Sequence, residues 1–158
     1  MEVKDLQFLL GKWNGFGLAV YHDIIPVSYS EVLNCEYEAG KDLIYYSQFT
    51  KYTDPQKDGK TLHMESGFIR KSETGAIELS NAQNNGRVEV MMLDDCDLFA
   101  ENVHLLFRSK LFGNDPRMII TERHYHCSGN KITYEMKMAT MKNTNLSTHL
   151  TGEIIREA

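Results

Sequence analysis

Short stretches of alternating apolar and polar residues, separated by turn residues, run through the whole chain and constrain its fold more than any other feature. In the segment KITYEMKMAT, Ile132 and Tyr134 fall on one face of an extended chain, and Thr133 and Glu135 fall on the other. Alternation of this kind indicates strands that have one packed face and one solvated face. The sequence therefore predicts an all-β protein.

Ten segments match this strand pattern, and residues 4–10 predict one short helical turn before them. The ten segments are 12–21, 27–38, 42–53, 60–71, 75–83, 87–93, 98–109, 117–127, 131–141 and 146–157. Turn residues separate many of them, and Asn85-Gly86 is a good two-residue hairpin signal because a type I′ turn needs positive φ at both central positions.

The connections are short, so neighbouring strands are expected to pair antiparallel, and no crossover helix is available for a parallel sheet. Ten strands in a meander would expose two sheet edges, which closure into a barrel removes. We therefore predict a ten-stranded antiparallel up-and-down β-barrel, with a two-sheet sandwich as the alternative. A barrel of more than eight strands has an interior wider than side chains alone easily fill, so a cavity is expected.

Composition narrows the functional classes. The chain has 158 residues, which predicts a single domain over 1–158, and its formal net charge is −5. An acidic chain without a Lys/Arg stripe argues against nucleic-acid binding. No apolar run approaches a membrane span, and the N-terminus does not read as a signal peptide. Three scattered cysteines favour reduced thiols in a cytoplasmic protein over a disulfide framework.

The motif GKWNGFG places Gly11, Trp13, Gly15 and Gly17 on one face of the first strand. Glycine inside a strand marks a bulge, a bend or a close approach. Such a face suits either barrel curvature or a flat ligand laid against the backbone. The motif lacks the spacing and the strand–turn–helix context of a phosphate-binding loop.

A second motif, LHMESGFIR, places His63 and Glu65 on one face of a strand. The pair could bind a metal ion or perform acid–base chemistry, and Glu65 could fix the tautomer of His63 through a hydrogen bond. The alternative interpretation is a polar pair on the outer wall or a satisfied interior network.

A third motif, ERHYHC, aligns His124 and His126 on one strand face. A metal site there would need a third ligand from elsewhere, such as His22 or His104, so an outward-facing pair is the favoured interpretation. No serine elbow, Cys/His arrangement or carboxylate pair has a spacing that singles it out as catalytic.

Several of these segments together resemble the nitrobindin family of small haem-binding barrels, which includes the haem-binding domain at the C-terminus of an animal zinc-finger protein. The resemblance runs nearly end to end, and its most specific parts are the Gly-x-Trp-x-Gly-x-Gly start and the His-Leu-x-x-x-x-x-Arg end. The matching segments are LLGKWNGFG (9–17), YSE (29–31), LIYYSQFT (43–50), LHMESGFIR (62–70), GAIELSNAQNNGRVEV (75–90), ITYEMKMA (132–139) and HLTGEIIR (149–156).

The resemblance implies a barrel like those of fatty-acid-binding proteins and lipocalins, with haem b at its mouth and iron held by the last-strand histidine, here His149. Family members are described as binding nitric oxide on ferric haem and isomerising peroxynitrite to nitrate. A single neutral imidazole leaves the sixth iron position open for a small ligand. On this basis the expected metal ligand is His149, and the expected cofactor-binding residues are His149, His63, Gly11, Trp13, Gly15 and Gly17.

Two stretches depart from the family pattern. The first motif commonly continues Gly-x-Tyr-Pro-Thr-Ile, and this chain has Ala19 in place of the glycine, His22 in place of the proline and Asp23 in place of the threonine. In the family this stretch lies near the haem, so Asp23 would add an anion there or shift the loop. The segment 140–145, TMKNTN, replaces a small Ala-Val-Gly stretch.

The phase of the last strand conflicts with the role that the resemblance gives to His149. On strict alternation His149 shares its face with Thr151 and Glu153, whereas Leu150 and Ile154 form the apolar face. If the apolar face points inward, His149 points outward. Either a bulge resets the phase, or His149 lies at a partly open mouth.

The first hypothesis is therefore a cytoplasmic haem-binding barrel that takes a small-molecule ligand and acts as a peroxynitrite isomerase. The second is a haem-free carrier or sensor of an apolar ligand, and the third is an interaction module with a filled barrel. Neither nucleic acid nor a membrane is an expected partner, and a homodimer is left open. If the first strand closes against the last, Trp13 should plug the end opposite the ligand mouth and stack on Arg156.

Overall fold

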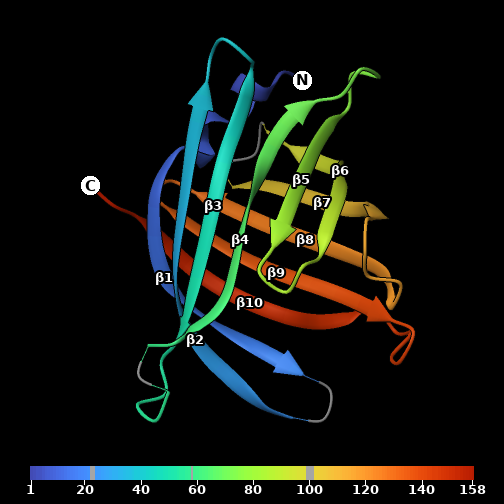
Figure 1. The fold of residues 1–158 in the computed structure, drawn as a ribbon. Helices are drawn as coiled ribbons and strands as arrows, with labels where there is room; N and C mark the ends of the chain where they lie inside the picture. Colours follow the sequence, from blue (N-terminus) through green and yellow to red (C-terminus); the bar gives the residue numbers. More distant parts are fainter. Residues whose placement is uncertain (22–23, 58, 99–101) are drawn as a thin grey trace.

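The computed structural model describes residues 1–21, 24–57, 59–98 and 102–158. Within these residues ten strands form a closed antiparallel barrel in which each strand pairs with its neighbour in sequence and β1 closes against β10 (Figure 1). The strands are β1 (Gly11–Tyr21), β2 (Ile24–Glu38), β3 (Leu43–Tyr52), β4 (Thr61–Lys71), β5 (Ile77–Gln83), β6 (Val88–Asp97), β7 (Val103–Phe112), β8 (Met118–Ser128), β9 (Lys131–Thr140) and β10 (Ser147–Arg156). The predicted barrel is confirmed, and a two-sheet sandwich is excluded.

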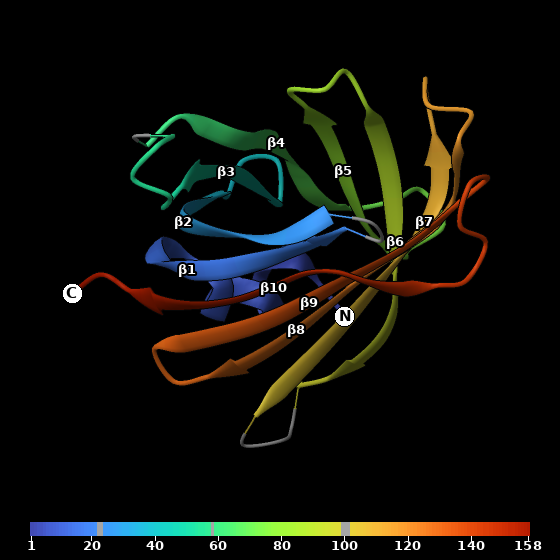
Figure 2. The same cartoon turned by 90° about the horizontal axis from the view of Figure 1, so that it is seen from below.

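A short 3₁₀ helix, η1 (Val3–Leu9), precedes β1 and lies across one opening of the barrel, as the view along the barrel shows (Figure 2). Glu2 and Asp5 form a capping box at its start, and its apolar side chains join the core. The predicted N-terminal helical turn is therefore confirmed. Among the described residues, no helix is long and apolar enough to span a bilayer.

Trp13 and Arg156 connect the first strand to the last at this closed end. The two residues are register partners between β1 and β10, and the Arg156 guanidinium carbon lies 4.4 Å from the centre of the Trp13 ring. Trp13 is fully buried, and its Nε1 donates a hydrogen bond to the Leu9 carbonyl at 2.9 Å. Arg156 Nη2 also donates to the carbonyl of Phe8. The predicted stacking contact is therefore confirmed.

The interior divides into a packed half and a hollow half. On β9 the inward residues Ile132 and Tyr134 are buried in the closed half, whereas Met136 and Met138 line a cavity farther along the same face. The alternation predicted for this segment is clear over Lys131–Tyr134, whereas farther along the strand Lys137 also lines the cavity and Ala139 is buried. The apolar core lies beneath the cavity, on the side of η1.

The glycines of β1 make room for tyrosine rings inside the barrel. A Cβ atom built on Gly17 would lie 2.3 Å from the Tyr29 ring, and one on Gly152 of β10 would lie 2.4 Å from the Tyr134 ring. At Gly15 the obstacle is backbone, since a Cβ would lie 1.9 Å from the Glu153 carbonyl oxygen. Close packing accounts for these glycines, and the Tyr29 ring occupies the surface at Gly17 that the sequence left open to a flat ligand or to barrel curvature.

Candidate functional site

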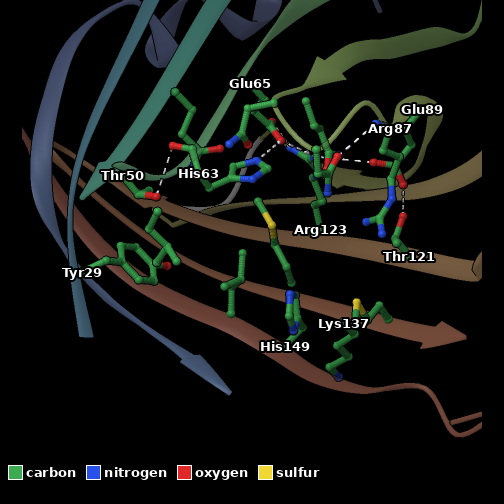
Figure 3. Close-up of a pocket in the computed structure, with 18 of the residues that line it drawn as sticks. Tyr29, Thr50, His63, Glu65, Arg87, Glu89, Thr121, Arg123, Lys137 and His149 are labelled. Atoms are coloured by element: carbon green, nitrogen blue, oxygen red, sulfur yellow. Dashed lines mark hydrogen bonds and ion pairs between the residues drawn. The ribbon is translucent and has the colours of Figure 1, made fainter. Parts of the chain in front are cut away.

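The end of the barrel opposite η1 holds a cavity of about 330 Å³ (Figure 3). Side chains from β2 to β6 and from β8 to β10 line it, together with the β5–β6 turn. The lining residues are Tyr29, Gln48, Thr50, Leu62, His63, Glu65, Gln83, Asn84, Asn85, Arg87, Glu89, Thr121, Glu122, Arg123, Met136, Lys137, Met138, His149 and Leu150. The expected internal cavity is therefore present.

A β-bulge in β10 turns His149 into this cavity. Thr148 pairs with Lys137 and Leu150 pairs with Met136, so β10 has one residue more than β9 at this point, and that residue is His149. The bulge lets two successive side chains, His149 and Leu150, face the cavity, which strict alternation forbids. Of the two outcomes open from sequence, the bulge is the one observed.

The surroundings of His149 favour one tautomer of a neutral imidazole. Its Nδ1 lies 3.2 Å from the Val20 carbonyl oxygen, and because a carbonyl only accepts, Nδ1 must carry the hydrogen. Burial lowers the pKa of His149, which favours the uncharged ring. The hydrogen-free nitrogen is then Nε2, and an imidazole oriented through its other nitrogen is the usual form of a metal-ligating histidine.

His63 enters the same cavity from β4, on a different wall from His149 (Figure 3). A second bulge helps here, since Thr50 pairs with His63 while Lys51 pairs with Thr61, so that Leu62 and His63 both line the cavity. His63 Nε2 lies 3.2 Å from Glu65 Oε2. The outer-wall interpretation of this pair is therefore wrong, and the pair belongs to an interior network.

Glu65 is the centre of a buried ionic layer at the base of the cavity. Arg123 donates to both Glu65 oxygens at 2.5 and 3.1 Å and to Glu89 at 3.3 Å, and Tyr46 donates to Glu65 at 2.8 Å. Burial alone would raise the pKa of Glu65, but the Arg123 guanidinium and the His63 hydrogen bond hold it well below its usual range. An ionised Glu65 can only accept, so the hydrogen between it and His63 is on His63 Nε2.

A second carboxyl, Glu31, lies 2% exposed beside this layer. Gln48 Nε2 donates to its Oε1 at 2.5 Å, and the Tyr134 hydroxyl donates to its Oε2. Tyr29, which lines the cavity, lies 2.7 Å from the Tyr134 hydroxyl. Burial raises the pKa of Glu31 to about 7 despite these hydrogen bonds, so this carboxyl keeps its proton to a higher pH than an exposed glutamate does.

The other predicted site residues lie elsewhere. Gly11, Trp13, Gly15 and Gly17 are not among the residues that line this cavity, because their face of β1 meets the tyrosine rings, the β10 backbone and the closed end. Their contact with haem stays a prediction that this geometry does not favour. The departures at residues 22–23 lie outside the described residues, whereas Ala19 is fully buried.

The His124–His126 pair lies on the outer wall, as favoured from sequence. Both rings stack on His104 of β7, with centroid distances of 5.8 Å from His124 and 4.6 Å from His126. Across the described residues, no group of three His, Cys, Asp or Glu side chains could hold a metal ion. Arg123, the residue before this pair, lies on the opposite face of β8 and points into the barrel, as alternation along a strand requires.

The lining suits a porphyrin in its chemistry. The cavity offers one oriented imidazole donor, apolar side chains for the ring and cationic side chains for anionic propionates. The apolar residues are Leu62, Met136, Met138 and Leu150, and cationic side chains include Arg87 and Lys137. Arg87 is already paired with Asp115, with Nη2 and Oδ2 3.0 Å apart. A haem group therefore fits the residues present.

Comparison with known proteins places the chain among haem-binding barrels. The chain is 32% identical over 148 residues to a peroxynitrite isomerase of Arabidopsis thaliana, a match covering 94% of this chain and 84% of that protein. It is 27% identical over 159 residues to peroxynitrite isomerase 2 of Mycobacterium avium, covering 99% and 95% of the two chains. The crystal structure of Rv2717c from M. tuberculosis superposes with a TM-score of 0.84 at 26% identity, covering 99% of this chain and 97% of that one.

The family model described as the THAP4-like, heme-binding beta-barrel domain matches residues 2–156. This match covers η1, every strand and the bulged histidine of β10. The chain therefore belongs to the THAP4-like family of haem-binding β-barrel domains.

Proposed function

We propose that this protein binds haem b through His149 and, in the haem-bound form, isomerises peroxynitrite to nitrate, with nitric oxide as a further small ligand. The observation that supports this most is the β10 bulge, which turns His149 into the cavity while Val20 holds its Nδ1. The relatives named peroxynitrite isomerase support the reaction. When bound, the haem would supply an iron with one open position.

The protein's own residues would orient the cofactor and shape the space around the small ligand. Leu150 and the methionines of β9 would contact the porphyrin, and Lys137 would attract a propionate. His63 would hold a proton on Nε2, where ionised Glu65 accepts its hydrogen bond, and would present its ring to the cavity from β4. The isomerisation rearranges the atoms of one anion, so no further reactant is required.

The ionic base of the cavity argues against the haem-free carrier. An apolar chain reaching inward would meet Glu65 and Arg123, which already satisfy one another. The filled-barrel hypothesis does not fit a cavity of about 330 Å³. The free cysteines, of which Cys35 and Cys127 are buried, support a reducing compartment such as the cytoplasm, and a homodimer stays a prediction.

A hemin titration tests the ligand assignment. We expect the wild-type protein to shift the Soret band of added hemin and His149→Ala to lose the histidine-ligated spectrum. His124→Ala, on the outer wall, is the matched control and should behave as wild type. An unchanged spectrum in His149→Ala would show that another group ligates the iron. Stopped-flow measurement of peroxynitrite decay, with nitrate quantified, then tests the reaction in the loaded protein.

A further inference from the structure

A second, smaller hollow lies inside the barrel beneath the ionic layer. It measures about 30 Å³, and the side chains around it are mostly apolar. The lining includes Ile132 at 0% exposure, Phe107 at 1%, Leu79 at 2% and Ile69 at 4%, so buried side chains form much of its wall. A volume of one probe sphere, roughly 10–15 Å³, is the minimum for a water molecule, so this hollow has room for a molecule of one or two heavy atoms.

Several polar groups that reach this compartment are already hydrogen bonded to other side chains. Glu31 accepts from Gln48 and Tyr134, and the Tyr46 hydroxyl donates to Glu65. Among the described residues, the one buried side-chain nitrogen or oxygen without a partner is Nε of an arginine at the closed end, outside this lining. A buried water needs two to four polar partners, so these hydrogen bonds leave a water molecule in this space fewer groups to bind.

The compartment adjoins the haem cavity. Gln48 lines both spaces, and its amide is held by Glu31, which also lines the lower one. A small uncharged molecule could pass this point when the Gln48 side chain turns, whereas an anion would meet the buried carboxyls. The lower space is therefore selective by both size and charge.

We propose that this compartment is a binding site for a small apolar gas molecule, such as nitric oxide or dioxygen, next to the haem cavity. A preformed space of this size with mostly apolar walls gives a small apolar molecule dispersion contacts with the side chains around it. The site belongs to the haem-free barrel, so it does not depend on the haem assignment. Xenon, an apolar atom, is the probe.

Methyl NMR of the haem-free protein under xenon pressure tests the site. We expect saturable shifts of the Ile69, Leu79 and Ile132 methyl groups, with the Leu150 methyls in the upper cavity unaffected. Shifts confined to Leu150 would place xenon in the upper cavity, and no saturable shift at any of these methyls would show that the lower space does not bind gas. Either result overturns the proposal.

Two variants at one position check the location. Leu79→Phe should fill the space and abolish the shifts of the Ile69 and Ile132 methyls, while Leu79→Ala should enlarge it and make them saturate at lower xenon pressure. Leu18→Phe, at a partly exposed position on the wall, is the control for a leucine-to-phenylalanine change. If Leu79→Phe does not fold, as circular dichroism would show, the Leu79→Ala result still decides. Unchanged saturation in Leu79→Ala would contradict the assignment.

Discussion

Glu31→Gln should stabilise the protein at alkaline pH relative to wild type and change its stability little at acidic pH. A glutamine side chain has almost the same shape as glutamate, with an amide oxygen and nitrogen in place of the two carboxyl oxygens. Its hydrogen bonds with Gln48 and Tyr134 can be kept if the Tyr134 hydroxyl or the Gln48 amide rotates. What the substitution removes is the buried negative charge. The comparison with wild type therefore isolates the cost of ionising this group inside the barrel.

The magnitude follows from the pKa of Glu31, which burial raises from 4.5 to about 7. Because the folded value lies above the unfolded one, the folded state holds the proton more tightly, and ionisation costs stability progressively as pH rises from 4.5 to 7. At about 1.36 kcal/mol per pH unit, the full difference amounts to about 3 kcal/mol above pH 7 and vanishes below pH 4.5. The Glu31→Gln variant, with a neutral amide, would not incur this cost.

Urea unfolding of both proteins at a series of pH values between about 4.5 and 8.5 measures this difference. We expect the free energy of unfolding of Glu31→Gln, minus that of wild type, to rise by about 3 kcal/mol across the series. Glu153→Gln, an exposed carboxyl on the outer wall, is the control and should show no such rise. A Glu31→Gln difference that stays constant within about 0.5 kcal/mol would refute a raised pKa for this buried carboxyl.

Two further predictions concern the closed end and the glycines. In a double-mutant cycle, Trp13→Leu and Arg156→Lys should be coupled by about 0.5–2 kcal/mol in unfolding free energy, because lysine lacks the flat surface that stacks on the indole; additive effects would mean that the contact contributes nothing. Gly152→Ala should cost about 1–3 kcal/mol in a thermal or urea melt, because its Cβ would overlap the Tyr134 ring, whereas Gly113→Ala, with its nearest neighbour at 3.4 Å, should cost much less.

Much of the fold was predictable because the information lies in local pattern. Period-two alternation identifies strands, Gly and Asn mark turns, and short connections leave antiparallel pairing of neighbours as the outcome. The contact between Trp13 and Arg156 followed from closure of the first strand on the last. The resemblance located His149 at the start of that last strand, but neither alternation nor resemblance determined which way its ring points.

Tertiary structure decided the site. Glu65, Glu89 and Arg123 come from β4, β6 and β8, and no local spacing indicates that their side chains meet. The orientation of His149 depends on a one-residue bulge against β9, and a shift of one residue moves a side chain to the opposite face of a strand. Alternation in the sequence indicates which residues of one strand share a face. Where that alternation is interrupted depends on the register between strands, and the closed barrel as a whole sets that register.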